Sequence, residues 1–271
     1  MREDIGEIID YASKYFVTTV YDNGSLAAKR IDALRNVDFV AISLDTLDPK
    51  KLDYIKGVPG AWDNAMNSIQ TLRENGISVV ISPTISQLNQ YEIVDFTKHF
   101  IGQGLPVLYC LYSYDFESEN RLFSIGKQVD GLEVMDRGAL AKVCDELMEL
   151  KKKQQGIFIT SKVLDALERF FSQGQRTWTC EALRGFFIVD NLGRVAGCHL
   201  RQPVASIAEL ADQWENEKFH ELRSEYSKCD KCTYLCYIVY SLHSSVVGNL
   251  GIVKDQLKNI RLLRAQQNKQ R

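Results

Sequence analysis

Apolar and polar residues in the first half of the chain alternate between helical and strand-like patterns. These patterns predict helices over residues 5–12, 25–34, 62–75 and 90–101, and strands over residues 16–21, 37–44, 77–82 and 107–112. Strands and helices that alternate in this order predict a parallel sheet of the α/β class with about four βα units. In such sheets ligands bind at the carboxyl ends of the strands.

Polar side chains follow several of the predicted strands directly. These residues are Asn23, Ser43, Asp45, Thr84 and Asn89. A ligand at the carboxyl ends of the strands would contact them, so they are candidate binding residues. Asn, Ser and Asp also form turns and helix caps at such positions, and residue type alone does not separate the two interpretations.

The predicted strand over residues 16–21 is apolar and lacks a neighbour on one side. Four strands are too few to close a barrel, and an open apolar edge tends to pair with another strand. We therefore expect strands to be missing upstream. We also expect a partner chain, or self-association, to cover the open edge.

The second half of the chain contains most of the cysteines. Predicted helices over 136–153 and 160–173 precede an apparent hairpin over 186–198 and a helical stretch over 206–226. Five of the seven cysteines lie between positions 180 and 236, namely Cys180, Cys198, Cys229, Cys232 and Cys236. Cys110 and Cys144 lie outside this group, and we expect both in the core.

Four of the clustered thiols are predicted to bind a metal. Cys229 and Cys232 form a C-x-x-C pair, while Cys180 and Cys198 frame the predicted hairpin. Four thiolates suit either Zn²⁺ or a [4Fe–4S] cluster, and both interpretations remain open at this point. Cys236 is kept as an additional candidate ligand.

The composition narrows the range of partners. Lys plus Arg number 33 against 35 Asp plus Glu, which gives a net charge of −2. A chain with this balance has no global attraction for nucleic acid or an anionic membrane, so neither is an expected partner. No apolar run approaches the roughly 20 residues that span a bilayer, and the acidic start is unlike a secretory leader. We therefore expect a cytoplasmic protein, in which clustered thiols are more often metal ligands than disulfides.

Several motifs resemble the radical S-adenosylmethionine (radical SAM) enzymes that carry a C-terminal auxiliary-cluster domain of the SPASM or twitch type. The similar segments are Asp22-Asn23-Gly24, Ile42-Ser43-Leu44-Asp45, Lys56-Gly57-Val58-Pro59-Gly60-Ala61-Trp62, Cys180-x12-Gly193-x4-Cys198 and Cys229-x2-Cys232. The resemblance extends from Arg2 to about Cys236. It implies an incomplete (β/α)₆ barrel over residues 1–135, a helical bridge over 136–175, a small α+β cysteine-rich cluster domain over 176–240 and a C-terminal helix over 241–271.

The resemblance also implies cofactors and a reaction class. Enzymes of this family bind S-adenosylmethionine on a first [4Fe–4S] cluster and generate a 5′-deoxyadenosyl radical, so Asn23, Ser43, Asp45 and Asn89 would lie near S-adenosylmethionine or the substrate. An auxiliary [4Fe–4S] cluster would be held by Cys180, Cys198, Cys229 and Cys232. The substrate would be a small molecule or a peptide that the sequence does not identify.

Two motifs of the family do not occur in this sequence. They are the C-x3-C-x2-C of the first cluster and the Gly-Gly-Glu that holds the methionine amino group. The expectation is therefore an amino-terminally truncated form, a misassigned start or one half of a split enzyme. The competing hypotheses are a zinc-binding Cys₄ protein with a structural or partner-binding role and no catalysis, and a degenerate remnant without metal or activity.

Overall fold

The computed structural model describes residues 2–112, 131–132, 136–230 and 233–268. Its helices are α1 (Ile5–Ala12), α2 (Pro49–Lys56), α3 (Ala61–Glu74), α4 (Ile93–Gly102), α5 (Arg137–Lys153), α6 (Ser161–Gln173), α7 (Leu210–Gln213), α8 (Glu217–Ser227), α9 (Leu235–Leu242) and α10 (Val246–Asn268). Its strands are β1 (Thr19–Asp22), β2 (Phe39–Ile42), β3 (Val79–Ile81), β4 (Thr84–Ile85), β5 (Cys110–Leu111), β6 (Ile188–Val189), β7 (Arg194–Ala196) and β8 (Ala205–Ser206).

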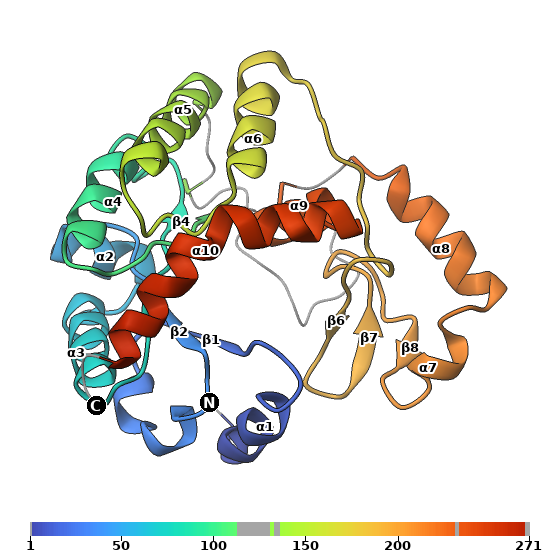
Figure 1. The fold of residues 1–271 in the computed structure, drawn as a ribbon, viewed down its shortest axis with the longest axis horizontal. Helices are drawn as coiled ribbons and strands as arrows, with labels where there is room; N and C mark the ends of the chain where they lie inside the picture. Colours follow the sequence, from blue (N-terminus) through green and yellow to red (C-terminus); the bar gives the residue numbers. More distant parts are fainter. Residues whose placement is uncertain (1, 113–130, 133–135, 231–232, 269–271) are drawn as a thin grey trace.

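The first half is built on parallel strands with helices on their outer side (Figure 1). β1, β2 and β3 pair in parallel in that order, and single parallel bridges from Ile81 to Val107 and from Val107 to Ile157 continue the series. Apolar side chains of the strands, such as Val40 and Val79, are fully buried because the outer helices cover them. The predicted α/β class is therefore confirmed.

One predicted helix of this half is wrong. Residues 25–34 form two short 3₁₀ turns, Ala27–Lys29 and Asp32–Leu34, instead of an α-helix. The cause lies just upstream, where Oδ1 of Asp22 accepts hydrogen bonds from the backbone amides of Gly24 at 2.7 Å and Ala27 at 3.4 Å. An Asp side chain that binds nearby amides competes with regular helical bonding and holds the chain in a turn.

The first strand is shorter than predicted. β1 begins at Thr19, and Phe16 and Val17 lie before it with 70% and 80% of their surface exposed. Together with Tyr11 and Tyr15, which are also exposed, they form an apolar surface that we call the α1–β1 patch. Among the described residues, β1 pairs with β2 alone. The other edge of β1 therefore has no strand beside it in the part of the chain that the structure describes.

The second half contains a separate three-stranded antiparallel sheet of order β6-β7-β8. It includes the predicted hairpin and lies with α7 and α8 on the side of the molecule away from α2 and α3 (Figure 1). The helix predicted over 206–226 is broken into α7 and α8, because the side chain of Asn216 caps α8 by accepting from the amide of Phe219 at 2.9 Å.

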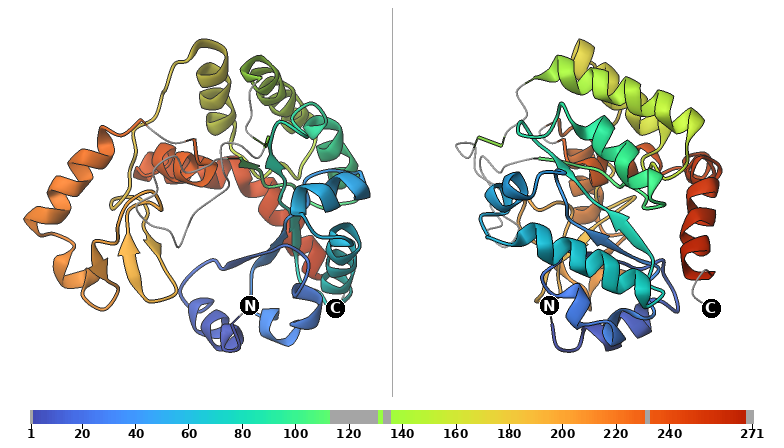
Figure 2. Two further views of the ribbon diagram at one scale, coloured as in Figure 1. Left: turned by 180° about the vertical axis from the view of Figure 1, so that it is seen from behind. Right: turned by 90° about the vertical axis from the view of Figure 1, so that its left-hand side faces the viewer.

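The C-terminal helix α10 crosses the amino-terminal ends of the parallel strands. Asn259 accepts from the amide of Gly156 at 2.8 Å and donates to the carbonyl of Ile157 at 2.8 Å, while Gln266 accepts from the amide of Val79 at 3.1 Å. Figure 2 shows α10 along one side of the molecule. The carboxyl ends of the strands, where α/β proteins bind ligands, lie opposite this helix.

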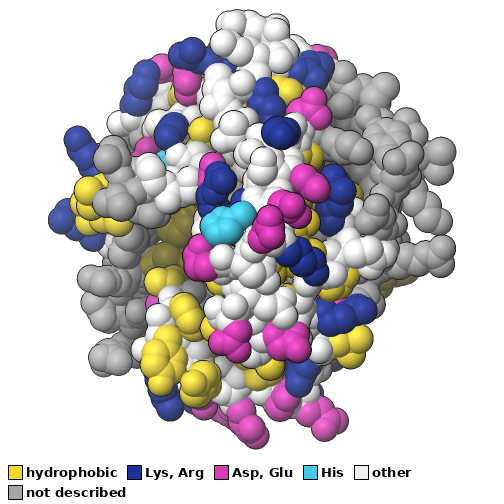
Figure 3. Space-filling view, turned by 90° about the vertical axis from the view of Figure 1, so that its right-hand side faces the viewer, with side chains coloured by type: hydrophobic (Ala, Val, Ile, Leu, Met, Phe, Trp, Pro, Cys, Tyr) yellow, Lys and Arg dark blue, Asp and Glu magenta, His cyan; other side chains and the backbone are white. Residues whose placement is uncertain are grey.

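Charge is evenly spread over the face that carries α8. Figure 3 shows acidic and basic side chains interspersed there, with hydrophobic side chains grouped along its lower left edge.

Within the described residues, no helix combines the length and the apolar character needed to cross a bilayer.

Candidate functional site

A buried carboxylate organises the carboxyl ends of the parallel strands. Asp45 follows β2, and only 2% of its side chain is exposed. Nζ of Lys56, at the end of α2, lies 2.6 Å from Oδ2 of Asp45 and donates to Oγ of Ser43 at 2.7 Å. Because an unpaired charge at a buried position is strongly unfavourable, the ion pair with Lys56 stabilises the Asp45 carboxylate at this position.

The same carboxylate holds the next strand in place. Oδ1 of Asp45 accepts from the amide of Thr84 at 2.7 Å, at the start of β4. Asn89 completes the connection, because its Nδ2 donates to the carbonyls of Asp45 at 2.7 Å and Thr84 at 2.9 Å. Its Oδ1 accepts from the amide of Ser86 at 2.7 Å. Asn89 is buried, and its side chain joins the ends of β2 and β4 through bonds to the backbone.

Lys56 is a site residue that the strand-end pattern does not reveal. It ends α2 just before Gly57, which adopts the left-handed conformation at a φ of 65°. The following turn is fixed by Asp53, whose Oδ2 accepts from the amide of Gly60 at 2.7 Å. Backbone amides, first that of Gly60, lower the pKa of the Asp53 carboxyl. The motif from Lys56 to Trp62 therefore forms a rigid turn that directs the ammonium group of Lys56 toward Asp45.

Asn23 lies at the end of the neighbouring strand. The amide of Ser43 donates to the carbonyl of Asp22 at 2.9 Å, which places the two strand ends side by side. Asn23 is exposed, and its Oδ1 accepts from the amide of Ser25 at 3.0 Å. The next residue must be glycine, because Gly24 has a φ of 86° and a Cβ there would lie 2.5 Å from Cα of Ala65. The structure thus brings the ends of β1, β2 and β4 together.

Cys110 and Cys236 also face this region. Cys110 is half-buried on β5, so the prediction of a core position is only partly right. Burial raises the pKa of its thiol, against the effect of the Ser82 hydroxyl. Burial also raises the pKa of Tyr21, and the nearby thiols of Cys110 and Cys236 add to that effect. Helix α9 therefore places Cys236 near the strand ends.

Three other cysteines form a second candidate site, between the hairpin and the end of α8. Burial raises the pKa of the Cys180 thiol, and the neighbouring thiol of Cys229 contributes. The phenol of Tyr226 lies near both Cys198 and Cys180. The backbone carbonyl of Tyr226 accepts a hydrogen bond from the amide of Cys229 at 2.9 Å. Cys232, the fourth predicted ligand, lies outside the described residues. We call Cys180, Cys198 and Cys229 the three-cysteine site.

A buried arginine ties the loop of Cys180 to α8. Nε of Arg223 donates to the carbonyl of Leu183 at 2.8 Å, and Nη2 donates to the carbonyl of Trp214 at 2.6 Å. The guanidinium also lies over the ring of Trp214, with its carbon 4.6 Å from the ring centroid. These contacts fix the position of the loop that contains Cys180 relative to the helix that ends beside Cys229.

The described thiols do not complete a metal site by themselves. Among the described residues, no three His, Cys, Asp or Glu side chains are grouped closely enough to hold one metal ion. The predicted fourth ligand, Cys232, lies outside the described residues.

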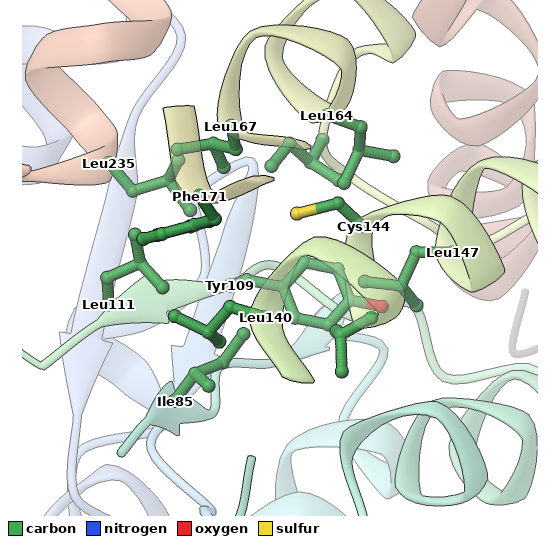
Figure 4. A pocket seen from close by; sticks show the side chains of 12 residues that line it. Ile85, Tyr109, Leu111, Leu140, Cys144, Leu147, Leu164, Leu167, Phe171 and Leu235 are labelled. Atoms are coloured by element: carbon green, nitrogen blue, oxygen red, sulfur yellow. The ribbon is translucent and has the colours of Figure 1, made fainter. Parts of the chain in front are cut away.

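The cavity that Cys144 faces is a small gap in the core. It has a volume of about 20 Å³ and is lined by apolar side chains, among them Leu140, Leu147 and Phe171 (Figure 4). A space of this size holds no more than about one water molecule. Burial raises the pKa of the Cys144 thiol to about 12, as expected for a packed core residue. The predicted core position of Cys144 is confirmed.

Replacing Lys56 with methionine is expected to lower the free energy of unfolding by about 2 to 3 kcal/mol, because the substitution leaves Asp45 buried without its cation. Urea denaturation measures this change. The control is Lys50→Met, since Lys50 is exposed on the same helix, and its effect should stay below about 0.5 kcal/mol. Equal effects of the two substitutions would show that the ion pair does not stabilise the strand ends.

Comparison with known proteins finds a family model that matches the first part of the sequence and relatives that align with most of it. Residues 1–99 match the family model described as the Radical SAM superfamily. The chain is 25% identical over 262 residues to the AdoMet-dependent heme synthase of Nitratidesulfovibrio vulgaris. The aligned region covers 86% of this chain and 69% of that protein. It is also 27% identical over 152 residues to the sporulation killing factor maturation protein SkfB of Bacillus subtilis. That aligned region covers 54% of this chain and 34% of that protein.

Solved structures share the same arrangement of elements. Native anSMEcpe with bound AdoMet matches with a TM-score of 0.54 at 14% identity, over 93% of this chain and 75% of that chain. At this identity the likeness shows the fold alone. Residues 1–99 therefore resemble the Radical SAM superfamily, and the chain as a whole is similar in sequence to an AdoMet-dependent heme synthase and in fold to anSMEcpe.

Proposed function

We propose that this chain belongs to an enzyme that performs S-adenosylmethionine-dependent radical chemistry, and that it carries an auxiliary [4Fe–4S] cluster. The observation that carries the proposal is the gathering of Cys180, Cys198 and Cys229 around Tyr226. This site belongs to a chain whose first 99 residues match the radical SAM family model. Thiolates at such a site are typical ligands of iron–sulfur clusters.

The strand ends supply groups that suit S-adenosylmethionine. The ammonium of Lys56, held by Ser43 and Asp45, is a cation directed into this region and can attract a carboxylate. Asn23 presents an exposed amide at the end of β1, and Asn89 fixes the loop after β4. S-adenosylmethionine would supply radical chemistry when bound and reduced by one electron, and these residues would hold and orient it toward the substrate.

The auxiliary cluster would be held by Cys180, Cys198, Cys229 and Cys232, with Cys236 left near the strand ends. Its role would be to bind substrate, pass electrons or brace the fold. A purely structural zinc protein is not favoured, because residues 1–99 match the Radical SAM superfamily model and the relatives include AdoMet-dependent heme synthases.

The substrate is proposed to be a peptide or a small molecule. The names of two relatives refer to the maturation of sporulation killing factor and to the biosynthesis of the bacteriocin subtilosin. One similar structure contains anSMEcpe with AdoMet and a peptide. The heme synthases among the relatives favour a small-molecule substrate instead. Binding assays with a peptide and with a tetrapyrrole separate these two classes.

Alanine substitution tests the ligands of the cluster. After anaerobic reconstitution with iron and sulfide, Cys180→Ala, Cys198→Ala, Cys229→Ala and Cys232→Ala should each lower bound iron, because four thiolates complete a [4Fe–4S] site. Cys236→Ala should leave it nearly unchanged, and Cys144→Ala is the control for loss of a buried thiol. Loss of iron at Cys236 with no loss at Cys232 would show that the ligand set is wrong.

Residues 1–271 alone are expected not to cleave S-adenosylmethionine. The sequence contains no C-x3-C-x2-C to hold the first cluster. The test incubates the reconstituted chain with S-adenosylmethionine and dithionite and measures 5′-deoxyadenosine by liquid chromatography. A yield above that of a no-protein control would refute the prediction.

The α1–β1 patch is proposed to contact a second polypeptide, with a second copy of the chain as the case to test. Its exposed aromatic side chains adjoin the open edge of β1, and both features favour association. Phe16→Lys should shift the chain toward monomer in size-exclusion chromatography with light scattering. Tyr54→Lys, at an exposed position on α2, is the control. A wild-type chain that stays monomeric and protects the amides of β1 from hydrogen exchange would contradict this proposal.

A further inference from the structure

The outer face of α10 carries a row of exposed apolar side chains. Leu250, Val253 and Leu257 have 67%, 51% and 43% of their surface exposed. Spacings of three and four residues place side chains on one face of a helix, so these three residues lie next to one another. We call them the α10 stripe. Aligned apolar groups that face solvent are typical of surfaces that bind another polypeptide.

The opposite face of α10 is held against the rest of the chain. Oδ1 of Asp255 lies 2.8 Å from Nζ of Lys151 in an ion pair. One turn further along the helix, the side chain of Asn259 is buried and donates to the carbonyl of Ile157 at 2.8 Å. Because these contacts fix the inner face, α10 cannot rotate to bury the stripe within its own chain.

The charge of α10 limits what can bind the stripe. Lys254 and Arg261 are exposed on the outer face, within one turn of Leu257. Residues 250–264 contain four basic residues and one acidic residue, which gives 4 − 1 = +3: Lys254, Lys258, Arg261, Arg264 and Asp255. Two α10 stripes that faced each other would bring like charges together, which is strongly unfavourable at an interface. A partner surface that is apolar and acidic fits the stripe better.

The α1–β1 patch combines exposed apolar side chains with acidic residues. Tyr11 and Tyr15 are 65% and 64% exposed, and their ring centroids lie 5.3 Å apart. Ile8, which is 43% exposed on the same helix, extends this apolar surface. Residues 2–17 contain two basic and four acidic residues, which gives 2 − 4 = −2: Arg2, Lys14, Glu3, Asp4, Glu7 and Asp10. Within one chain the patch and the stripe do not cover each other, because both stay exposed.

We propose that the α10 stripe of one copy of this chain binds the α1–β1 patch of a second copy. The inference rests on the contact proposed above for that patch, and it names the surface that the patch binds. The apolar side chains of both surfaces would be removed from water, which favours association. Lys254 and Arg261 would lie opposite the exposed carboxylates of Glu7 and Asp10, and this complementarity would select stripe-to-patch pairing over stripe-to-stripe pairing.

A charge exchange in the full chain tests this pairing, with sedimentation equilibrium at low salt as the measurement. Glu7→Lys and Lys254→Glu should each raise the dissociation constant of the pair at least about tenfold, because each places like charges at the contact. The double variant restores opposite charges, so its constant should return to within about threefold of wild type. Lys50→Glu is the control, since Lys50 is exposed outside both surfaces, and its effect should stay within about twofold.

Recovery in the double variant separates a direct contact from misfolding, since two damaging substitutions would not repair each other. Association that Phe16→Lys abolishes, but that Lys254→Glu leaves unchanged, would overturn the pairing with α10 and keep the contact between the patch and a second copy. A wild-type chain that stays monomeric at every concentration would overturn both. Neither result bears on iron binding, which is measured separately.

Discussion

The buried carboxylate of Asp45 is the constraint on which the strand-end site depends. A carboxylate that is almost fully removed from water needs a cation and hydrogen-bond donors, and Lys56 and the amide of Thr84 provide them. Those partners come from α2 and β4, so a single charge fixes three elements of the fold. Asn89 extends the arrangement by bonding the carbonyl of Asp45 itself. The ammonium of Lys56 is thus held at the strand ends by its pairing with Asp45.

In the cysteine-rich half, a buried arginine fixes a loop through hydrogen bonds to backbone carbonyls. Arg223 is buried, and it satisfies its donors on the carbonyls of Leu183 and Trp214. This joins the loop after Cys180 to α8, whose last turn carries Tyr226. In both halves a long cationic side chain therefore fixes a loop that carries candidate site residues. The difference is that the side chain of Lys56 stays 23% exposed, whereas that of Arg223 is only 6% exposed.

Patterns that depend on local sequence could be predicted, and contacts between distant segments could not. The alternation of strands and helices and the apolar face with Cys144 follow from side-chain periodicity, which the sequence shows directly. Residues 25–34 look helical, yet the carboxylate of Asp22 competes for their amides. Asn216 breaks a second predicted helix by capping it. The role of Lys56 depends on a turn that brings it back to Asp45, and no periodic pattern reports such a contact.

Helix α9 connects the two candidate sites. It follows the C-x-x-C segment and packs against β5, and its first turn carries Cys236 toward Tyr21 on β1. On the other side of the same helix, Tyr237 stacks on Phe186 of the cysteine-rich half, with ring centroids 4.7 Å apart. Helix α9 therefore contacts both the strand-end region and the cysteine-rich half. Because packed side chains leave few voids, the position of this one short helix constrains the side chains on both of its sides.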